Sequence, residues 1–372
     1  MLDRLPPELV DHILDLLIPS PATVDGAHER TIALRAFCLV LKAVRDRAEP
    51  LLWRDVAILS WDQGDRALLR FEDADEGTRE RLSKTRSLRI GVEGQLFYVE
   101  EIFGFLAFFP SLRELRMECE GLLDMGEVAR SVPNLETLTL NWAMKLFSST
   151  SFVLPSLTNL SLDRTDMFPS FATNLFASFT SALPSFRAFA FSPRDESTDS
   201  RSNDILFDSH SPGFLGRRST LDMLQLHLED VEQFSKPVFQ SYVPTAMTVT
   251  NDSLAQQWTT ELLIDRAPSH IRFYPSPTAQ TRPDIFVEAL QQLGHVINYS
   301  SPSPKSLHVP FLLRSEPSER ISELRTTLFA ACKRKAVEVL WYNSEEEEER
   351  AVSPSFWRYA RRIKAEKEKE TK

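Results

Sequence analysis

The chain contains little cysteine, little glycine and no long apolar run. Its three cysteines, Cys38, Cys119 and Cys332, lie far apart and form no Cys-x-x-Cys pair, which favours a reducing compartment. Only 11 glycines occur among 372 residues, where an average share of about 7% would give roughly 26. The apolar run 102–109 is too short to span a bilayer, and the N-terminus lacks the pattern of a secretory signal. The sequence therefore predicts a soluble cytoplasmic or nuclear protein.

Signatures of catalysis, metal binding and nucleotide binding are also missing. Gly121 and Gly126 have the spacing of a phosphate-binding loop, but Glu127 stands where that loop needs a lysine. None of the seven histidines has a partner at His-Glu-x-x-His spacing, and no Gly-x-Ser-x-Gly elbow occurs. We therefore expect no catalytic residues, no metal and no cofactor. A hydrolase or transferase remains an open hypothesis, because scattered acids and bases can converge in a fold; it predicts a deep polar pocket at strand ends.

Charge disfavours one class of partner. The formal net charge is −10, so the phosphate backbone of a nucleic acid is an unfavourable partner.

A repeated pattern, Pro-x-Leu-x-x-Leu-x-Leu, organises the middle of the chain. Its clear copies are 110–117, 133–140, 155–162 and 184–191, and 219–226 repeats it without the proline. The last four residues of each copy alternate apolar and polar, which predicts a short strand with one buried face. Weaker apolar pairs extend the series, at steps of 22–36 residues. Helical patterns stand between them, at 101–109, 122–132, 171–183, 254–264, 283–293 and 318–333. Alternating strands and helices predict an α/β fold with parallel strands and right-handed crossovers.

The repeats resemble leucine-rich repeats, although the asparagine or cysteine of the full consensus is missing. The resemblance implies an irregular right-handed solenoid over 57–342, with a polar insertion at 192–218. In that family, the residues between the core leucines face the concave surface and bind partners. This implies a substrate-binding set of Arg89, Arg116, Thr139, Ser161, Gln225, Arg272 and His308. Ala190, Thr248 and Glu338 lie at matching positions, and Arg116 is the strongest single candidate because a guanidinium can bind a carboxylate or phosphate bidentately.

The first 56 residues carry a different pattern. Apolar residues at helical spacing follow Leu5-Pro-Pro, a polar segment covers 19–29, and a second helical run begins near Thr31 and is expected to end at Glu49-Pro50. The segments LPPELVDHILDLL, LRAFCLVLKAVRDRA and PLLWRDV together resemble an F-box, particularly its fungal form. This resemblance implies a helical trio that docks on a Skp-type adaptor of a cullin ubiquitin ligase.

The F-box resemblance also implies which residues meet the adaptor or support its contact. They are Leu5, Pro6, Leu9, Ile13, Leu39, Val40 and Trp53. Two positions depart from the family: Val44 stands where tryptophan is common, and Leu41 where a second cysteine is common. The alternative is a helical cap that only seals the first strand of the solenoid.

Together the two resemblances imply the substrate-recognition subunit of a Skp–cullin–F-box ubiquitin ligase, which binds the adaptor and a protein substrate and catalyses nothing itself. The alternative is a leucine-rich-repeat scaffold that is not coupled to ubiquitination. Residues 343–372 form a third region, in which five successive glutamates, 345–349, precede a basic helical stretch. We expect that stretch to cap the last repeat rather than to serve as a binding tail.

Overall fold

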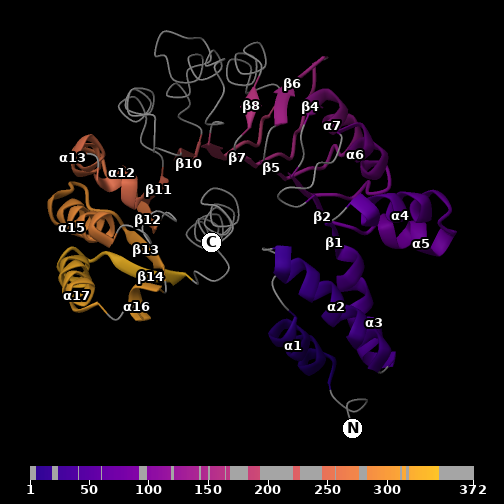
Figure 1. Ribbon diagram of the computed structural model, residues 1–372, viewed down its shortest axis with the longest axis horizontal. Coiled ribbons are helices and arrows are strands. Elements are labelled where there is room, and N and C mark those ends of the chain that lie inside the picture. Colours follow the sequence, from indigo (N-terminus) through magenta and orange to yellow (C-terminus); the bar gives the residue numbers. More distant parts are fainter. Residues whose placement is uncertain are drawn as a thin grey trace. The chain divides into compact units, whose positions relative to one another are not determined.

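A computed structural model describes the protein over a defined set of residues. They are 6–18, 24–40, 42–59, 61–91, 99–118, 121–141, 144–149, 151–163, 165–167, 183–192, 221–226, 245–255, 257–275, 283–310, 312–315 and 318–342. Helices and parallel strands alternate, which is the predicted α/β class (Figure 1). The chain divides into two compact units, Met1–Phe168 with Thr180–Ser185, and Pro169–Phe179 with Phe186–Lys372. The predicted insertion beyond Ser192 and the region 343–372 lie outside the described residues.

Three helices open the first unit: α1 (Pro7–Leu17), α2 (Val24–Val40) and α3 (Lys42–Arg54). Pro6 and Pro7 stand at the start of α1, where the backbone N–H groups have no partner within the helix and proline is tolerated. The three helices share one core. Its buried residues are Val10, Leu14, Ile18, Leu34, Val44 and Ala48.

The helix boundaries correct two expectations. The segment 24–29, expected to be part of a polar loop, forms the first turns of α2. The expected end at Pro50 is also wrong, because α3 continues through Pro50 to Arg54. Proline inside a helix costs about 3 kcal/mol. Leu51 and Leu52 pack against the three-helix core and offset that cost.

Five parallel strands follow one another across the main sheet of the first unit. They are β1 (Asp55–Ile58), β2 (Ser87–Ile90), β3 (Glu114–Glu118), β5 (Thr137–Asn141) and β7 (Asn159–Asp163), and each pairs with the next in chain order. Helices α4 (Trp61–Glu72), α5 (Glu76–Leu82), α6 (Val99–Leu106) and α7 (Met125–Ser131) occupy connections between strands.

Strand register aligns the repeated leucines in rows. Leu138 pairs with Leu160 and Leu140 with Leu162, and all four side chains are fully buried or nearly so. Leu115 continues the first row into β3 in the same way. The prediction that the apolar pairs share one core on neighbouring parallel strands is confirmed for these strands. Burying each leucine stabilises the fold by roughly 1.5–3 kcal/mol.

A second, smaller parallel sheet holds β4 (Gly121–Asp124), β6 (Met144–Phe147) and β8 (Asp166–Met167). The helix expected over 122–132 therefore begins only at Met125, because 121–124 pair as a strand. Asp124 caps that helix by accepting a hydrogen bond from the Gly126 N–H at 2.8 Å.

The second unit repeats the alternation. Its strands, in sheet order, are β9 (Ala188–Ser192), β10 (Met223–Leu226), β11 (Ala246–Thr250), β12 (His270–Tyr274), β13 (Ser306–Pro310) and β14 (Glu338–Tyr342). The pairs of neighbours are parallel. Phenylalanines fill much of this core. The rings of Phe189 and Phe191 stack with their centroids 6.0 Å apart, and the ring centroids of Phe273 and Phe286 are 5.8 Å apart.

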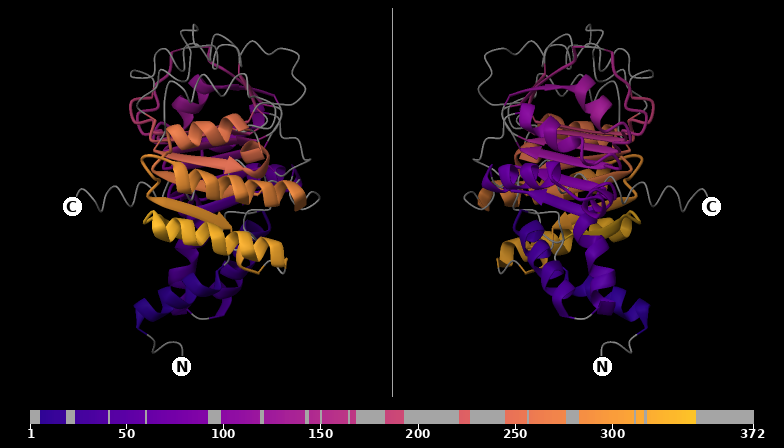
Figure 2. Two further views of the ribbon diagram at one scale, coloured as in Figure 1. Left: turned by 90° about the vertical axis from the view of Figure 1, so that its left-hand side faces the viewer. Right: turned by 90° about the vertical axis from the view of Figure 1, so that its right-hand side faces the viewer.

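Helices of the second unit mostly match their predicted positions. They are α12 (Asn251–Ala255), α13 (Gln257–Asp265), α15 (Pro283–Tyr299), α16 (Leu312–Ser315) and α17 (Glu319–Arg334). Figure 2 shows α15 and α17 side by side next to the strands. The predicted helix at 254–264 is split into two, and α15 runs six residues beyond its predicted end at Leu293. The helix expected at 171–183 lies outside the described residues, apart from Leu183.

Candidate functional site

The three N-terminal helices leave large apolar side chains in solvent. Leu9 on α1 is 49% exposed, and Leu39 near the end of α2 is 86% exposed. Pro6 is exposed as well, whereas Ile13 and Trp53 are half-buried. Of the residues expected to meet an adaptor, Leu5 and the side chain of Val40 lie outside the described residues. Sequence reasoning missed Leu16 and Leu17 as surface residues, at 71% and 58% exposure; their helical spacing from Leu9 was the available signal.

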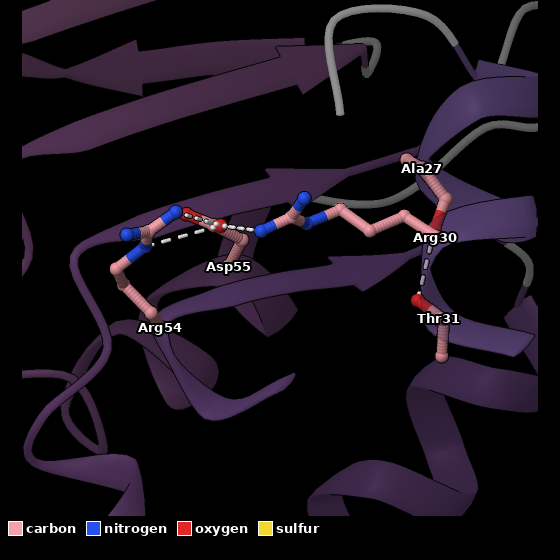
Figure 3. A network of polar contacts seen from close by, with 5 residues as sticks. All are labelled: Ala27, Arg30, Thr31, Arg54 and Asp55. Carbon is pink, nitrogen blue, oxygen red and sulfur yellow. Dashed lines mark hydrogen bonds and ion pairs between the residues drawn. The ribbon is translucent and has the colours of Figure 1, made fainter. Parts of the chain in front are cut away.

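An ion-pair network joins these helices to the first strand. Arg30 of α2 donates to the Asp55 carboxylate at 2.9 Å, and Arg54 donates to the same carboxylate at 3.1 Å (Figure 3). The side chains of Arg30 and Asp55 are only 10% and 13% exposed. Low exposure weakens screening by solvent, so this bridge holds α2 against the start of β1 more firmly than a surface ion pair would.

The best single candidate for substrate binding, Arg116, lies in an internal cluster. One carboxylate oxygen of Glu118 accepts hydrogen bonds from Arg116 at 3.0 Å, Arg89 at 3.2 Å and Asn141 at 3.2 Å. Arg89 and Glu118 are almost fully buried, and the Arg116 side chain is 17% exposed. Two guanidinium groups thus share one carboxylate. A ligand of Arg116 would have to compete with Glu118.

Glu118 was not among the predicted site residues. Residues two apart on a strand point to the same face, so the sequence already placed Glu118 beside Arg116. The missing information was that the register of β2, β3 and β5 brings Arg89 and Asn141 to the same carboxylate.

The remaining strand-face candidates are spread over both units and are mostly buried. Thr139 and Ser161 lie on neighbouring strands, at 1% and 2% exposure. In the second unit, Arg272 pairs in register with His308, and both are buried. The Ser306 hydroxyl lies 3.1 Å from Nε2 of His308. The side chain of Gln225 lies outside the described residues.

A cleft of about 600 Å³ opens in the first unit between α2, β1 and α4. Its apolar lining includes Ile32, Trp53 and Phe71, and the whole of β1 contributes to it. A second hollow of about 430 Å³ is polar and follows the turns before the strands, where Ser111, Asn134 and Ser156 occupy the position after each repeat proline. The small polar residue of the repeat therefore lines an exposed groove.

Metal ligands and a buried thiol were the remaining candidates for chemistry in the described part of the chain. Within it, no three His, Cys, Asp or Glu side chains gather closely enough to hold a metal ion. No helix there is both long enough and apolar enough to cross a membrane. Burial raises the pKa of the Cys332 thiol to about 11, so this thiol is protonated at neutral pH and is a poor nucleophile.

The carboxylate of Asp124 is held ionised for a structural reason. Burial acts to raise its pKa, but hydrogen bonds from the Ser149 side chain and from the backbone N–H groups of Gly126 and Ser149 outweigh burial and lower the pKa. The carboxylate tethers the start of α7 to the segment after β6.

In a comparison with known proteins, no protein-family model matches the chain, and no curated protein shows significant similarity to it.

Proposed function

We propose that the chain is the substrate-recognition subunit of a Skp–cullin–F-box ubiquitin ligase. Helices α1–α3 serve as the F-box, and the succession of strands and helices serves as an irregular right-handed solenoid that holds a protein substrate. The chain performs no bond chemistry. It acts by proximity, because it raises the effective concentration of substrate lysines near a ubiquitin-charged enzyme.

One observation carries the proposal: α1 is apolar on two faces. Val10 and Leu14 point into the three-helix core and are 6% and 2% exposed. Leu9 and Leu16, seven positions apart, share a second face and are 49% and 71% exposed. A helix of a soluble protein normally shows one apolar stripe and an opposite polar face. The second stripe is supported as a docking surface because exposed apolar patches commonly mark partner sites.

One of the two departures from the F-box pattern, Val44, fits this arrangement, and the other, Leu41, lies outside the described residues. Val44 is 7% exposed and belongs to the core of the helical trio. Valine in place of tryptophan therefore changes the interior packing and not the exposed stripe. In the proposed assignment, Pro6, Leu9 and Leu39 touch the adaptor, whereas Ile13 and Trp53 support that contact.

Substrate capture is assigned to the polar face of the strands. Parallel strands in chain order place their alternate side chains in rows across one sheet face, and this spacing supports an extended binding surface. Of the two arginines on that face, Arg116 is the more exposed, at 17%, and a substrate carboxylate would bind it in place of Glu118. Only a minority of the strand-face residues needs to contact the substrate, since few interface residues usually carry most of the affinity.

The test replaces Leu9 with aspartate in the full-length chain and measures retention of a purified Skp-type adaptor. We expect at least a tenfold loss, because docking would bury an unpaired carboxylate. Leu122→Asp is the matched control: Leu122 is 54% exposed on β4, so the same substitution at similar exposure should leave retention unchanged. Equal retention by both variants would reject the ligase proposal and favour a scaffold without ubiquitination.

A further inference from the structure

Strand β1 is an edge strand of the sheet that the described residues form. Among the described strands it ends the sheet and pairs with β2 alone. The carbonyls of Arg54 and Ile58 accept hydrogen bonds from the N–H groups of Arg86 and Gly91, both at 2.9 Å. Backbone groups of successive strand residues point to opposite edges, so those of Asp55 and Ala57 point away from β2. An open edge of this kind is a template for pairing with another strand.

The cleft of about 600 Å³ lies along this edge. Asp55, Val56, Ala57, Ile58 and Leu59 all line it, with α2 and α4 as its walls. The Arg30–Asp55 bridge ties α2 to the first residue of β1 (Figure 3). That bridge sets the position of one wall and keeps α2 from separating from the strand. The shape of the cleft is therefore fixed by contacts within the first unit.

Most of the charged side chains that line the cleft are basic. Among the described residues that line it, the basic side chains are His28, Arg35, Arg66 and Arg70. The single acid among them is Asp55, whose carboxylate already pairs with two arginines. The chain as a whole carries a net charge of −10, so a basic cleft runs against the overall balance. It favours an anionic ligand.

We propose that this cleft binds an extended peptide segment of a partner protein, which adds to β1 as a further strand and carries acidic side chains alternating with apolar ones. Main-chain hydrogen bonds to Asp55 and Ala57 supply the strand pairing. The acidic side chains can reach Arg35 on α2 and Arg70 on α4, and the apolar ones can lie against Ile32 and Phe71 on the same two helices. The site goes beyond the proposed ligase role and does not require it.

The experiment screens the full-length chain against two immobilised libraries of blocked eight-residue peptides. One library alternates Asp or Glu with Val, Ile, Leu or Phe, and the other alternates Lys or Arg with the same apolar residues. We expect enrichment from the acidic library only, with binding that weakens as salt rises. Equal enrichment from both libraries, or none from the acidic one, would overturn the proposal.

The strand geometry is tested on the best acidic peptide in two N-methylated forms, one methylated at odd and one at even positions. Strand addition uses the N–H groups of alternate residues, so one form should lose about tenfold or more in affinity and the other should bind nearly as before. Equal behaviour of the two forms would exclude strand addition and indicate a site for a small amphipathic anion.

Two protein variants locate the site. Ala57→Pro removes the edge N–H without touching the β1–β2 hydrogen bonds, since edge strands tolerate proline where the N–H faces outward. Arg35→Glu reverses a rim charge, and Arg35→Lys is its matched control. We expect both Ala57→Pro and Arg35→Glu to lose peptide binding and Arg35→Lys to keep it. Wild-type peptide affinity in Arg35→Glu would contradict the assignment even if Ala57→Pro failed to fold.

Discussion

At the scale of single residues, the Glu118 carboxylate decides the chemistry of the strand face in the first unit. It is the shared acceptor for Arg89, Arg116 and Asn141. Removing a partner from a buried ion pair costs far more than the pair itself contributes, because the remaining charge has lost its solvation without compensation. Arg116→Glu is therefore a poor probe of substrate binding, because it would bring two carboxylates together and disturb the fold.

We expect Glu118→Ala to destabilise the protein by about 3–5 kcal/mol, since it leaves Arg89 and Arg116 without their shared carboxylate. The free energy of unfolding in urea measures the effect. Glu127→Ala is the control: the side chain of Glu127 is 40% exposed, and its loss should change stability by less than about 1 kcal/mol. Equal stability of the two variants would show that the Glu118 cluster contributes nothing to the free energy of unfolding.

At the scale of elements, the carboxyl ends of β1, β2 and β3 are held together at Gly91. This residue directly follows β2, adopts φ 87° and donates its N–H to the Ile58 carbonyl of β1 at 2.9 Å. A Cβ atom at this position would lie 2.1 Å from the Glu118 carbonyl oxygen of β3. Glycine is needed here for both reasons, the left-handed backbone and the close approach of the next strand.

Gly91→Ala should destabilise the protein by at least about 2 kcal/mol, because the left-handed conformation alone costs roughly 1–2 kcal/mol and the backbone of β3 must also move. Gly294→Ala is a control for which we expect a shift in the opposite direction. Gly294 lies inside α15 with no atom within 4 Å of an added Cβ, so alanine there should stabilise by up to about 1 kcal/mol. Melting temperatures that shift in the same direction would contradict this assignment.

At the scale of the whole molecule, the first 56 residues run directly into the main sheet of the first unit. The predicted boundary falls inside β1 (Asp55–Ile58), and α3 leads into that strand without a linker. Cutting there removes half of the edge strand together with the Arg30–Asp55 bridge. The edge of β2 is then exposed to solvent, and the contacts between the three helices and the rest of the unit are lost.

We expect the chain lacking residues 1–56 to melt several degrees lower and to self-associate, because an exposed edge of β2 invites pairing between copies. Size-exclusion chromatography with light scattering measures the association. Leu9→Asp in the full-length chain should stay in its wild-type oligomeric state, since Leu9 is already half-exposed. A truncated chain with the wild-type melting temperature and the wild-type oligomeric state would show that the sheet folds independently of the helical trio.

The sequence by itself determined the strand positions and the α/β class. In the repeat Pro-x-Leu-x-x-Leu-x-Leu, apolar residues alternate with polar ones, so that alternate residues share a face of a strand. The strands β3, β5, β7 and β9 form where this pattern predicts them. Parallel pairing and the buried rows of leucine followed from the same rule. Helix boundaries were less accurate at Pro50 and at 121–124, where packing and strand pairing overrode local preference.

Tertiary structure alone decided which side chains meet. Register places Arg89, Arg116 and Asn141 on one carboxylate, although these residues come from three strands and span more than fifty positions. The cleft beside β1 likewise unites residues of α2 and α4, which share no sequence motif. Local patterns record which face a side chain occupies, because that depends on neighbours in sequence. Contacts between distant segments depend on register and helix placement, which arise only when the whole unit packs.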